Sequence, residues 1–241
     1  MNILVGTSGW SYKEWKGSFY PAKMRAEEML HFYAGQFPTV EVNNSFYRIP
    51  AERVLAGWAE QVPDTFRFVM KASRRITHNN RLKDEDGSLS YFLRAINPLG
   101  NRLGPTLFQL PPTFKKDLDR LRDFLAALPR HWTAAFEFRH PSWFVDEVYE
   151  LLRSRDAALV AVDEDEAEGG VGSPLVPTAS WGYLRLRRGQ YDEAALGSWA
   201  CRIRENSWSD AYVFLKHEDG SPTGPGAAAQ MQQSLDSERV T

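Results

Sequence analysis

Short segments of this chain alternate apolar with polar or charged residues, and the charges keep to one face. In segment 39–43, Glu41 and Asn43 share a face opposite two valines, and in segment 134–139 Glu137 lies opposite two phenylalanines. Because successive side chains of a strand point to opposite sides, each segment is predicted as a strand with an apolar face and an ionic face. Amphipathic stretches separate these segments, which indicates parallel strands covered by helices and ionic faces turned to a shared interior.

Strands and helices alternate along the whole chain. The predicted strands are 2–7, 39–43, 66–71, 105–110, 134–139, 158–163, 182–186 and 211–217. The predicted helices are 24–37, 53–61, 88–99, 118–128, 144–153 and 191–206, with a closing helix at 227–235. This alternation predicts a single-domain (β/α)8 TIM-type barrel over residues 1–241. A doubly wound open sheet has the same alternation and is the alternative.

The register of the polar residues favours the barrel. One assignment of faces turns a polar side chain from each of six strands into the interior, namely Glu41, Lys71, Gln109, Glu137, Asp163 and Arg185. The same assignment turns the apolar residues of these strands towards the helices. We therefore expect these polar side chains to converge within one cavity.

Composition narrows the classes of function. The chain has 241 residues, is 43% hydrophobic, and balances 29 Lys and Arg against 31 Asp and Glu, for a net charge of -2. It therefore lacks a chain-wide basic surface for nucleic acid, although a local patch remains open. The single Cys201 excludes an intramolecular disulfide, and the sequence shows neither a signal-peptide pattern nor an apolar run of membrane-spanning length. We expect a cytoplasmic protein without a membrane partner.

Longer sequence blocks resemble the YecE-like family, domain of unknown function 72. The blocks are GTSGWSY at 6–12, FYP at 19–21, VEVNNSFYR at 40–48, FQLPP at 108–112, EFRH at 137–140 and FLKHE at 214–218. They extend from the first predicted strand to the last. The resemblance implies a TIM-type barrel but no settled reaction, so the function has to be argued from the chemistry of the residues.

Three acidic residues are the candidate catalytic groups. Glu41, Glu137 and Asp163 lie near the ends of predicted strands, where barrel enzymes keep their active sites. Close like charges and partial burial are expected to raise one carboxyl pKa towards neutral pH, which suits general acid and base catalysis. The alternative is an ionic lattice with Lys71, Arg139 and Arg185 that serves stability alone.

A metal site has weaker support in the sequence. The chain has 5 His, of which His78, His140 and His217 fall near predicted strand ends. A multinuclear zinc barrel needs more histidines than this, and no HExxH motif is present. We expect no organic cofactor and leave a single divalent metal, bound by a carboxylate and dispersed histidines, as an alternative.

Basic residues gather after the third predicted strand. Segment 65–83 contains six Lys or Arg residues and no Asp or Glu, and His78 adds polar reach. Lys71 should point inwards, and Arg185 and Lys216 should make the same end of the barrel electropositive, close to where barrels commonly bind phosphate. A small anionic ligand is the expected partner, and a solvated basic loop is the alternative.

These observations lead to one hypothesis with two rivals. We expect an enzyme of hydrolase or lyase type whose carboxyl-terminal barrel mouth binds an anionic, phosphorylated ligand. The expected ligand-binding residues are Trp10, Asn43, Tyr47, Lys71, His78, Gln109, Arg139, Arg185 and Lys216. Trp10 and Tyr47 are expected to stack on a base or sugar ring, or else to close the top of the barrel as packing groups. The rivals are a nucleic-acid-binding or repair protein, by analogy with barrel endonucleases, and a binding module without catalysis.

Overall fold

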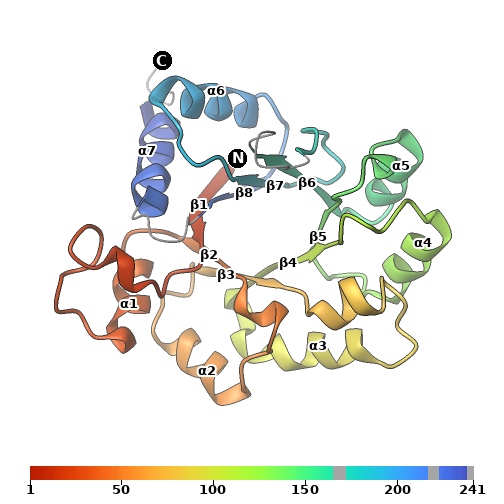
Figure 1. Cartoon of the computed structure of the whole chain (residues 1–241), viewed down its shortest axis with the longest axis horizontal. Helices are drawn as coiled ribbons and strands as arrows, with labels where there is room; N and C mark the ends of the chain where they lie inside the picture. The colour runs from red at the N-terminus through yellow and green to blue at the C-terminus, as the bar shows by residue number, and fades with distance from the viewer. Residues whose placement is uncertain (165–171, 217–222, 238–241) are drawn as a thin grey trace.

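Eight parallel strands close into a barrel in the order in which they occur along the chain (Figure 1). The computed structural model describes residues 1–164, 172–216 and 223–237. The strands are β1 (Asn2–Ser8), β2 (Thr39–Val42), β3 (Arg67–Lys71), β4 (Leu103–Gln109), β5 (Ala134–Glu137), β6 (Ala158–Asp163), β7 (Gly182–Leu186) and β8 (Asp210–Leu215). Strand β1 pairs with β8 from Asn2 opposite Asp210 to Thr7 opposite Leu215, which closes the ring. The predicted (β/α)8 TIM-type barrel is confirmed.

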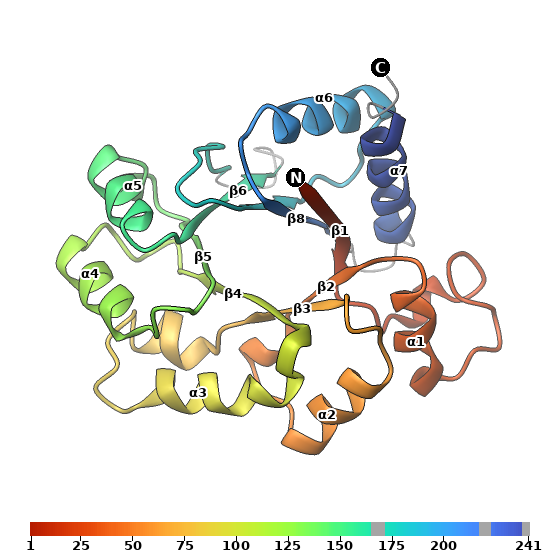
Figure 2. The same cartoon turned by 180° about the vertical axis from the view of Figure 1, so that it is seen from behind.

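Helices surround the barrel on its outer side (Figure 2). The α-helices are α1 (Met29–Ala34), α2 (Glu52–Glu60), α3 (Ser88–Ile96), α4 (Leu118–Ala127), α5 (Asp146–Arg153), α6 (Glu193–Arg204) and α7 (Thr223–Ser237). Shorter helical turns are η1 (Lys13–Trp15), η2 (Ala26–Glu28), η3 (Asn44–Phe46), η4 (Arg75–Asn79), η5 (Asn97–Arg102) and η6 (Pro141–Trp143). Each predicted helix is present with shifted ends. No helix is found in the described residues between β6 and β7.

The apolar core has two layers, one on each side of the strands. Between strands and helices, Phe68, Phe108 and Phe136 are fully buried, as expected for parallel strands under a helical cover. Inside the barrel a smaller cluster contains Leu107 and Phe214 and fills the interior below the polar residues. The interior is therefore packed, and the polar site lies above this plug at the ends of the strands.

The predicted register is correct for five of the six strands and wrong for β6. Val160 and Val162 belong to the interior cluster, and Asp163 instead turns towards helix α6. The Asp163 carboxylate accepts hydrogen bonds from Trp199 Nε1 at 2.8 Å and Tyr191 at 3.1 Å. All six residues of β6 are buried, so no polar face marked its interior side, and one acidic residue was an insufficient guide.

Among the described helices, none combines the length and hydropathy that a membrane span requires.

Candidate functional site

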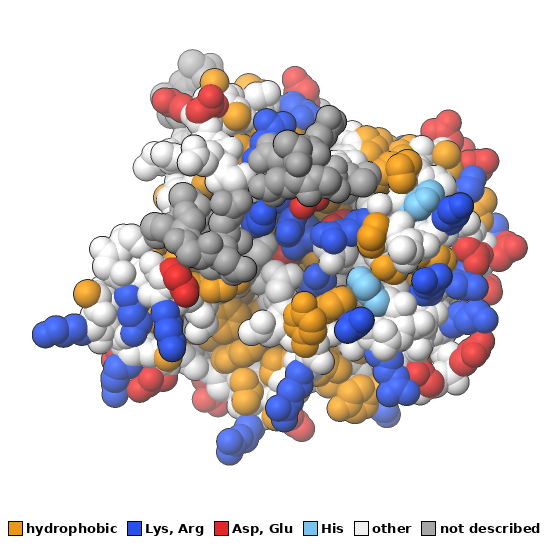
Figure 3. Space-filling model, viewed as in Figure 1, with side chains coloured by type: hydrophobic (Ala, Val, Ile, Leu, Met, Phe, Trp, Pro, Cys, Tyr) orange, Lys and Arg blue, Asp and Glu red, His pale blue; other side chains and the backbone are white. Residues whose placement is uncertain are grey.

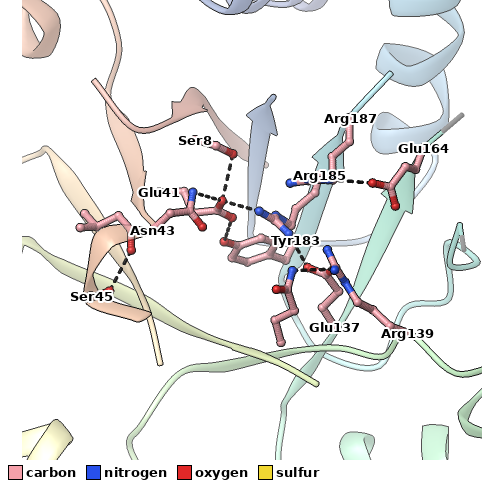
Figure 4. Close-up of polar contacts among 12 residues, drawn as sticks. Ser8, Glu41, Asn43, Ser45, Glu137, Arg139, Glu164, Tyr183, Arg185 and Arg187 are labelled. Carbon is pink, nitrogen blue, oxygen red and sulfur yellow. Dashed lines mark hydrogen bonds and ion pairs between the residues drawn. The ribbon is translucent and has the colours of Figure 1, made fainter. Parts of the chain in front are cut away.

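A buried arginine joins two buried carboxylates across the barrel interior. Arg185, from β7, donates from Nη2 to Glu41 Oε1 at 2.8 Å and from Nη1 to Glu137 Oε2 at 2.5 Å. The exposed fraction of each of these side chains is 2% or less. Figure 4 shows the three side chains pointing towards one another from β7, β2 and β5. The expected convergence is therefore present for these residues, and Arg185 stands at its centre.

Glu41 accepts further hydrogen bonds on the β1 and β7 sides. Tyr183 donates to Glu41 Oε2 at 2.7 Å, and Ser8 and Asn43 donate to Glu41 Oε1 at 2.9 and 3.0 Å. Ser8 is brought there by the strand register, because it lies opposite Glu41 in the β1–β2 pair. Both carboxylate oxygens of Glu41 are thus occupied by neighbours, which fixes the rotamer of this side chain.

Glu137 is held in the same way by one residue of β4 and by one residue that follows β5. Gln109, which lies opposite Glu137 in the β4–β5 pair, donates from Nε2 to Oε1 at 2.8 Å. Arg139 donates from Nε to the same oxygen at 2.8 Å and remains 32% exposed. Arg139 therefore links the buried carboxylate to the open mouth of the barrel.

Both glutamates are ionised, which corrects the expected rise of a carboxyl pKa. Burial alone would raise the pKa of Glu137, but Arg185 and Arg139 outweigh burial and hold it far below the usual range. Burial likewise opposes the effect of Arg185 and Tyr183 at Glu41, and the net result is a lowered pKa. The prediction failed because it considered the repulsion between carboxylates without the arginine that separates them.

The arginine carries one unsatisfied donor. Within the described residues, the buried Nε of Arg185 has no hydrogen-bond partner, although both Nη groups are paired. The two carboxylates raise the pKa of Arg185 against the opposing effect of burial, so it stays charged. An unpaired donor on a buried cation is costly, and this cost marks the centre of the network as a place that favours an acceptor.

Lys71 lies in the same interior without an ionic partner. Its Nζ is 4.5 Å from the centre of the Phe46 ring, and it makes no ion pair or hydrogen bond to another described residue. Burial and then the charge of Arg185 lower the pKa of Lys71 to about 8. At pH 7 about a tenth of this amine is therefore uncharged, far more than for a lysine with the ordinary pKa of about 10.4.

His78 lies beside Lys71 and is kept neutral. Its ring packs against Phe46 with 4.8 Å between ring centres, and Nδ1 is 2.9 Å from the Thr77 hydroxyl. Burial and then the charge of Lys71 lower the pKa of His78 to about 4. The imidazole is thus able to donate or accept a hydrogen bond without adding charge at neutral pH.

Arginine and lysine side chains gather at the middle of this face of the barrel (Figure 3). Arg187, which follows β7, lies 3.3 Å from a carboxylate oxygen of Glu164. Burial and then Arg185 lower the pKa of Arg187, which reports the concentration of positive charge. Arg187 therefore adds a further cation to the group formed by Lys71, Arg139 and Arg185.

The remaining predicted residues lie around this centre and not within it. Asp163 faces α6, as described above, and its place among the interior carboxylates is a wrong prediction. Trp10 packs edge-on against Trp58, with 4.8 Å between ring centres. It also lines a cavity of about 460 Å³ together with Asn43. Lys216 lines a separate cavity of about 280 Å³ between β7, β8 and α7. Tyr47 is 78% exposed, so it does not fill the top of the barrel.

Three contributors to the network were missed by the sequence reasoning, and one of them, Ser8, lies opposite Glu41 in the β1–β2 pair. Tyr183 is buried against Glu41, although its position two residues before Arg185 already placed it on the same strand face. Arg187 follows the same rule two residues after Arg185, beyond the end of β7. The alternation that identified Arg185 was therefore sufficient to find Tyr183 and Arg187.

The alternative of a single divalent metal site finds no support in the positions of the described side chains. Within the described residues, no three His, Cys, Asp or Glu side chains are grouped as metal ligands. His140 instead bonds to Ser142 at 2.9 Å in the turn after β5, and His217 lies outside the described residues. The two interior carboxylates are already occupied by arginine.

The basic segment after β3 is partly neutralised by nearby acidic residues. Arg75 Nε lies 2.8 Å from Asp86 Oδ2, and Lys83 Nζ lies 3.5 Å from Glu85 Oε1. Both ion pairs are on the exposed surface. Arg81 turns towards the ring of Phe114. This segment therefore presents less free positive charge than its sequence indicates.

The chain resembles two bacterial proteins over more than half of its length. It is 34% identical over 143 residues to UPF0759 protein YecE of Escherichia coli K12, which covers 59% of this chain and 50% of YecE. It is 31% identical over 188 residues to UPF0759 protein YunF of Bacillus subtilis, which covers 73% of this chain and 64% of YunF. The matches thus span between half and two thirds of the relatives' length.

Solved structures and the family assignment agree with this fold. A DUF72 family protein of Thermotoga maritima superposes with a TM-score of 0.87 at 28% identity, covering 98% of this chain and 100% of the other. A DUF72 family protein of Enterococcus faecalis has the same fold, with a TM-score of 0.76 at 20% identity over 97% of this chain and 95% of the other. The family described as protein of unknown function DUF72 matches residues 4–241. The chain therefore belongs to the DUF72 family, which includes the YecE-like proteins.

Proposed function

We propose that this protein is an enzyme of hydrolase or lyase type that binds an anionic, phosphorylated ligand at the mouth of its barrel. The observation that carries the proposal is the group of cations around the buried carboxylates. Lys71 has no acceptor among the described residues, and the buried Nε of Arg185 has none either. A phosphate or carboxylate offers several acceptor oxygens to such donors.

Accessibility favours Arg139 as the group that first contacts the anion, and the amine of Lys71, deeper in the interior, is the second. Arg139 is partly exposed and keeps a fixed orientation through its bond to Glu137. Arg185 is enclosed by Glu41 and Glu137, so its main effect is to hold these carboxylates in place. The ligand is thus bound by Arg139 and Lys71 on a rigid inner ion-pair network.

The pKa values favour Lys71 over the glutamates as the proton-transfer group. A carboxylate whose pKa lies far below 7, as for Glu137, is a weak base and is not protonated to act as an acid. An amine with a pKa of about 8, as for Lys71, exchanges protons near neutral pH. We therefore assign proton transfer to Lys71 and electrostatic positioning to Glu41 and Glu137.

Nucleic-acid binding has less support. It requires free positive charge along the segment after β3, where Arg75 and Lys83 are paired with acidic residues. The overall charge of -2 also supplies no general attraction to a polyanion.

A ligand screen tests the proposal. Thermal shift and calorimetric titration with inorganic phosphate and sugar phosphates are expected to show saturable binding by the unmodified chain. Lys71→Met and Arg139→Gln should each weaken the affinity by about tenfold or more, since each removes a charge-assisted hydrogen bond. The exposed Lys23 serves as a control, because Lys23→Met removes the same charge outside the site. If no phosphorylated compound or phosphate binds, or if all variants bind equally, the proposed function is wrong.

A further inference from the structure

We propose that Lys71 is a covalent catalyst whose amine forms a Schiff base with an anionic aldehyde or ketone. The inference deepens the proposed function, on which it rests, because the same mouth supplies the cations that bind the anionic group. It adds a specific nucleophile and a substrate class, namely a small carbonyl compound that carries a phosphate or carboxylate.

The position of Lys71 carries the inference first. The residue ends β3 on the interior side of the barrel, and its side chain passes over the ring of Phe46 with Nζ 4.5 Å from the ring centre. No carboxylate pairs with it among the described residues, although Glu41 and Glu137 are both close enough to act on its charge. A structural lysine of a buried ionic lattice is expected to pair with such carboxylates. Here Arg185 and Arg139 take those bonds and leave the amine free.

The surroundings of the amine make it nucleophilic. Desolvation and a neighbouring cation are two established means by which proteins activate a lysine, because both disfavour the ammonium form. Both act here, since burial and Arg185 bring the pKa of Lys71 to about 8. The rings of His78 and Phe46 are in contact, and Lys71 lies over the same Phe46 ring. Because the pKa of His78 is about 4, its imidazole is neutral near pH 8 and adds a polar contact without adding positive charge.

The chemical step requires no oxidant, reductant or metal. The lone pair of Lys71 Nζ attacks the carbonyl carbon and forms a C–N bond, while the carbonyl oxygen takes up the proton that the nitrogen loses, relayed through water. The resulting hydroxyl takes a second proton from solvent and leaves as water, which breaks the C–O bond. The product is a protonated imine that withdraws electrons from the adjacent carbon, which promotes lyase-type bond cleavage or proton transfer at that carbon.

The anionic group of the substrate determines its placement. Arg139 is the partly exposed cation next to the mouth, and its Nε is fixed by Glu137, so its Nη groups are the donors directed away from that bond. When the phosphate or carboxylate of a substrate binds to Arg139, a carbonyl group that is a few atoms along the same molecule is directed towards the amine of Lys71. This arrangement selects short substrates over long ones.

Reductive trapping tests the Schiff base. The protein is incubated at pH 8 with pyruvate, glycolaldehyde phosphate or dihydroxyacetone phosphate, reduced with cyanoborohydride, and analysed by intact mass and peptide mapping. We expect at least one compound to add one reduced adduct per chain, on Lys71, at a rate at least tenfold above that of Lys23. The Lys71→Arg variant keeps the positive charge and should lose this adduct.

A second measurement separates this inference from the proposed function. Competitive labelling of amines with acetic anhydride across pH 6 to 11 should give a midpoint near 8 for Lys71, below the ordinary lysine value of about 10.4. If phosphate binds to the mouth but Lys71 is trapped no faster than Lys23 with every probe, the Schiff base is wrong while the binding function stands. A Lys71 labelling midpoint above 10 overturns the inference in the same way. If phosphate does not bind either, the proposed function itself fails.

Discussion

At the scale of single residues, Arg185 is the group on which the site depends. It is buried, and it bonds to Glu41 and to Glu137 from a strand on another side of the barrel. Removing charges from water costs several kcal/mol per ion, so this network offers little net stability over apolar packing. At the strand ends this network fixes Arg139 through Glu137 and leaves the amine of Lys71 without a carboxylate partner among the described residues.

Replacing the central arginine should be far more harmful than replacing one of its partners. Arg185→Met leaves two ionised carboxylates inside the barrel, and we expect the free energy of unfolding at pH 7 to fall by about 3–5 kcal/mol. Because the pKa of both glutamates is lowered in the folded state, they contribute stability above the usual carboxyl pKa and lose it as pH falls through the lowered values. The Arg185→Met defect should therefore diminish below pH 4.5, the unperturbed value.

Urea denaturation of the parent chain and of Arg185→Met, at pH 7 and at pH 4, measures this loss of unfolding free energy. The triple variant Glu41→Gln, Glu137→Gln, Arg185→Met is the control, since it removes the charges together and should be more stable than Arg185→Met alone. An equal loss at both pH values would show that the carboxylates are not the cause.

At the scale of elements, β6 connects the barrel to α6 through Asp163. Its carboxylate accepts from Trp199 Nε1 on the helix and from Arg188 Nε at 2.8 Å in the loop after β7. The side chain is 8% exposed, so its partners are largely shielded from water. A carboxylate in this position links helix α6 to strand β6 and does not face the interior of the barrel.

Substituting this carboxylate should affect stability without affecting binding. Asp163→Asn keeps the shape but loses the charge that pairs with Arg188, and we expect a loss of about 1–3 kcal/mol in the free energy of unfolding. Phosphate affinity, measured by calorimetry, should stay within about twofold of the parent chain. A variant with normal stability and abolished phosphate binding would return Asp163 to the site.

The elements also show how far sequence reasoning reaches. Glu41, Gln109, Glu137 and Arg185 each lie between two large apolar residues in the sequence, so they were assigned to the interior correctly. The sequence of β6 is ALVAVD, with one polar residue at its end, and an alternating pattern cannot be read from it. The direction of the carboxyl pKa shifts was out of reach for another reason. Glu41 and Arg185 are 144 residues apart, and only the closure of the barrel reveals their contact.

At the scale of the whole molecule, the barrel concentrates positive charge at one end of a chain with a net charge of -2. Under the proposed function, such a local field would attract a small anion into the mouth, where the low dielectric would strengthen each contact. A polyanion would instead need a continuous basic track on the surface. The exposed ion pairs Arg75–Asp86 and Lys83–Glu85 interrupt such a track beside the mouth.

Salt dependence distinguishes these two kinds of ligand. Nucleic-acid binding through the segment after β3 would release counterions, and the double variant Arg74→Ala, Arg75→Ala would flatten the dependence of log K on log salt by about one unit per lost contact. We expect instead that single- and double-stranded oligonucleotides fail to bind at 50 and 200 mM salt, and that this double variant binds phosphate like the parent chain. Lys71→Met should lose phosphate binding under the same conditions, since its charge lies inside the mouth. Tight oligonucleotide binding that depends on Arg74 and Arg75 and resists Lys71→Met would show that the functional surface is the exposed loop, and the barrel interior would then be a scaffold.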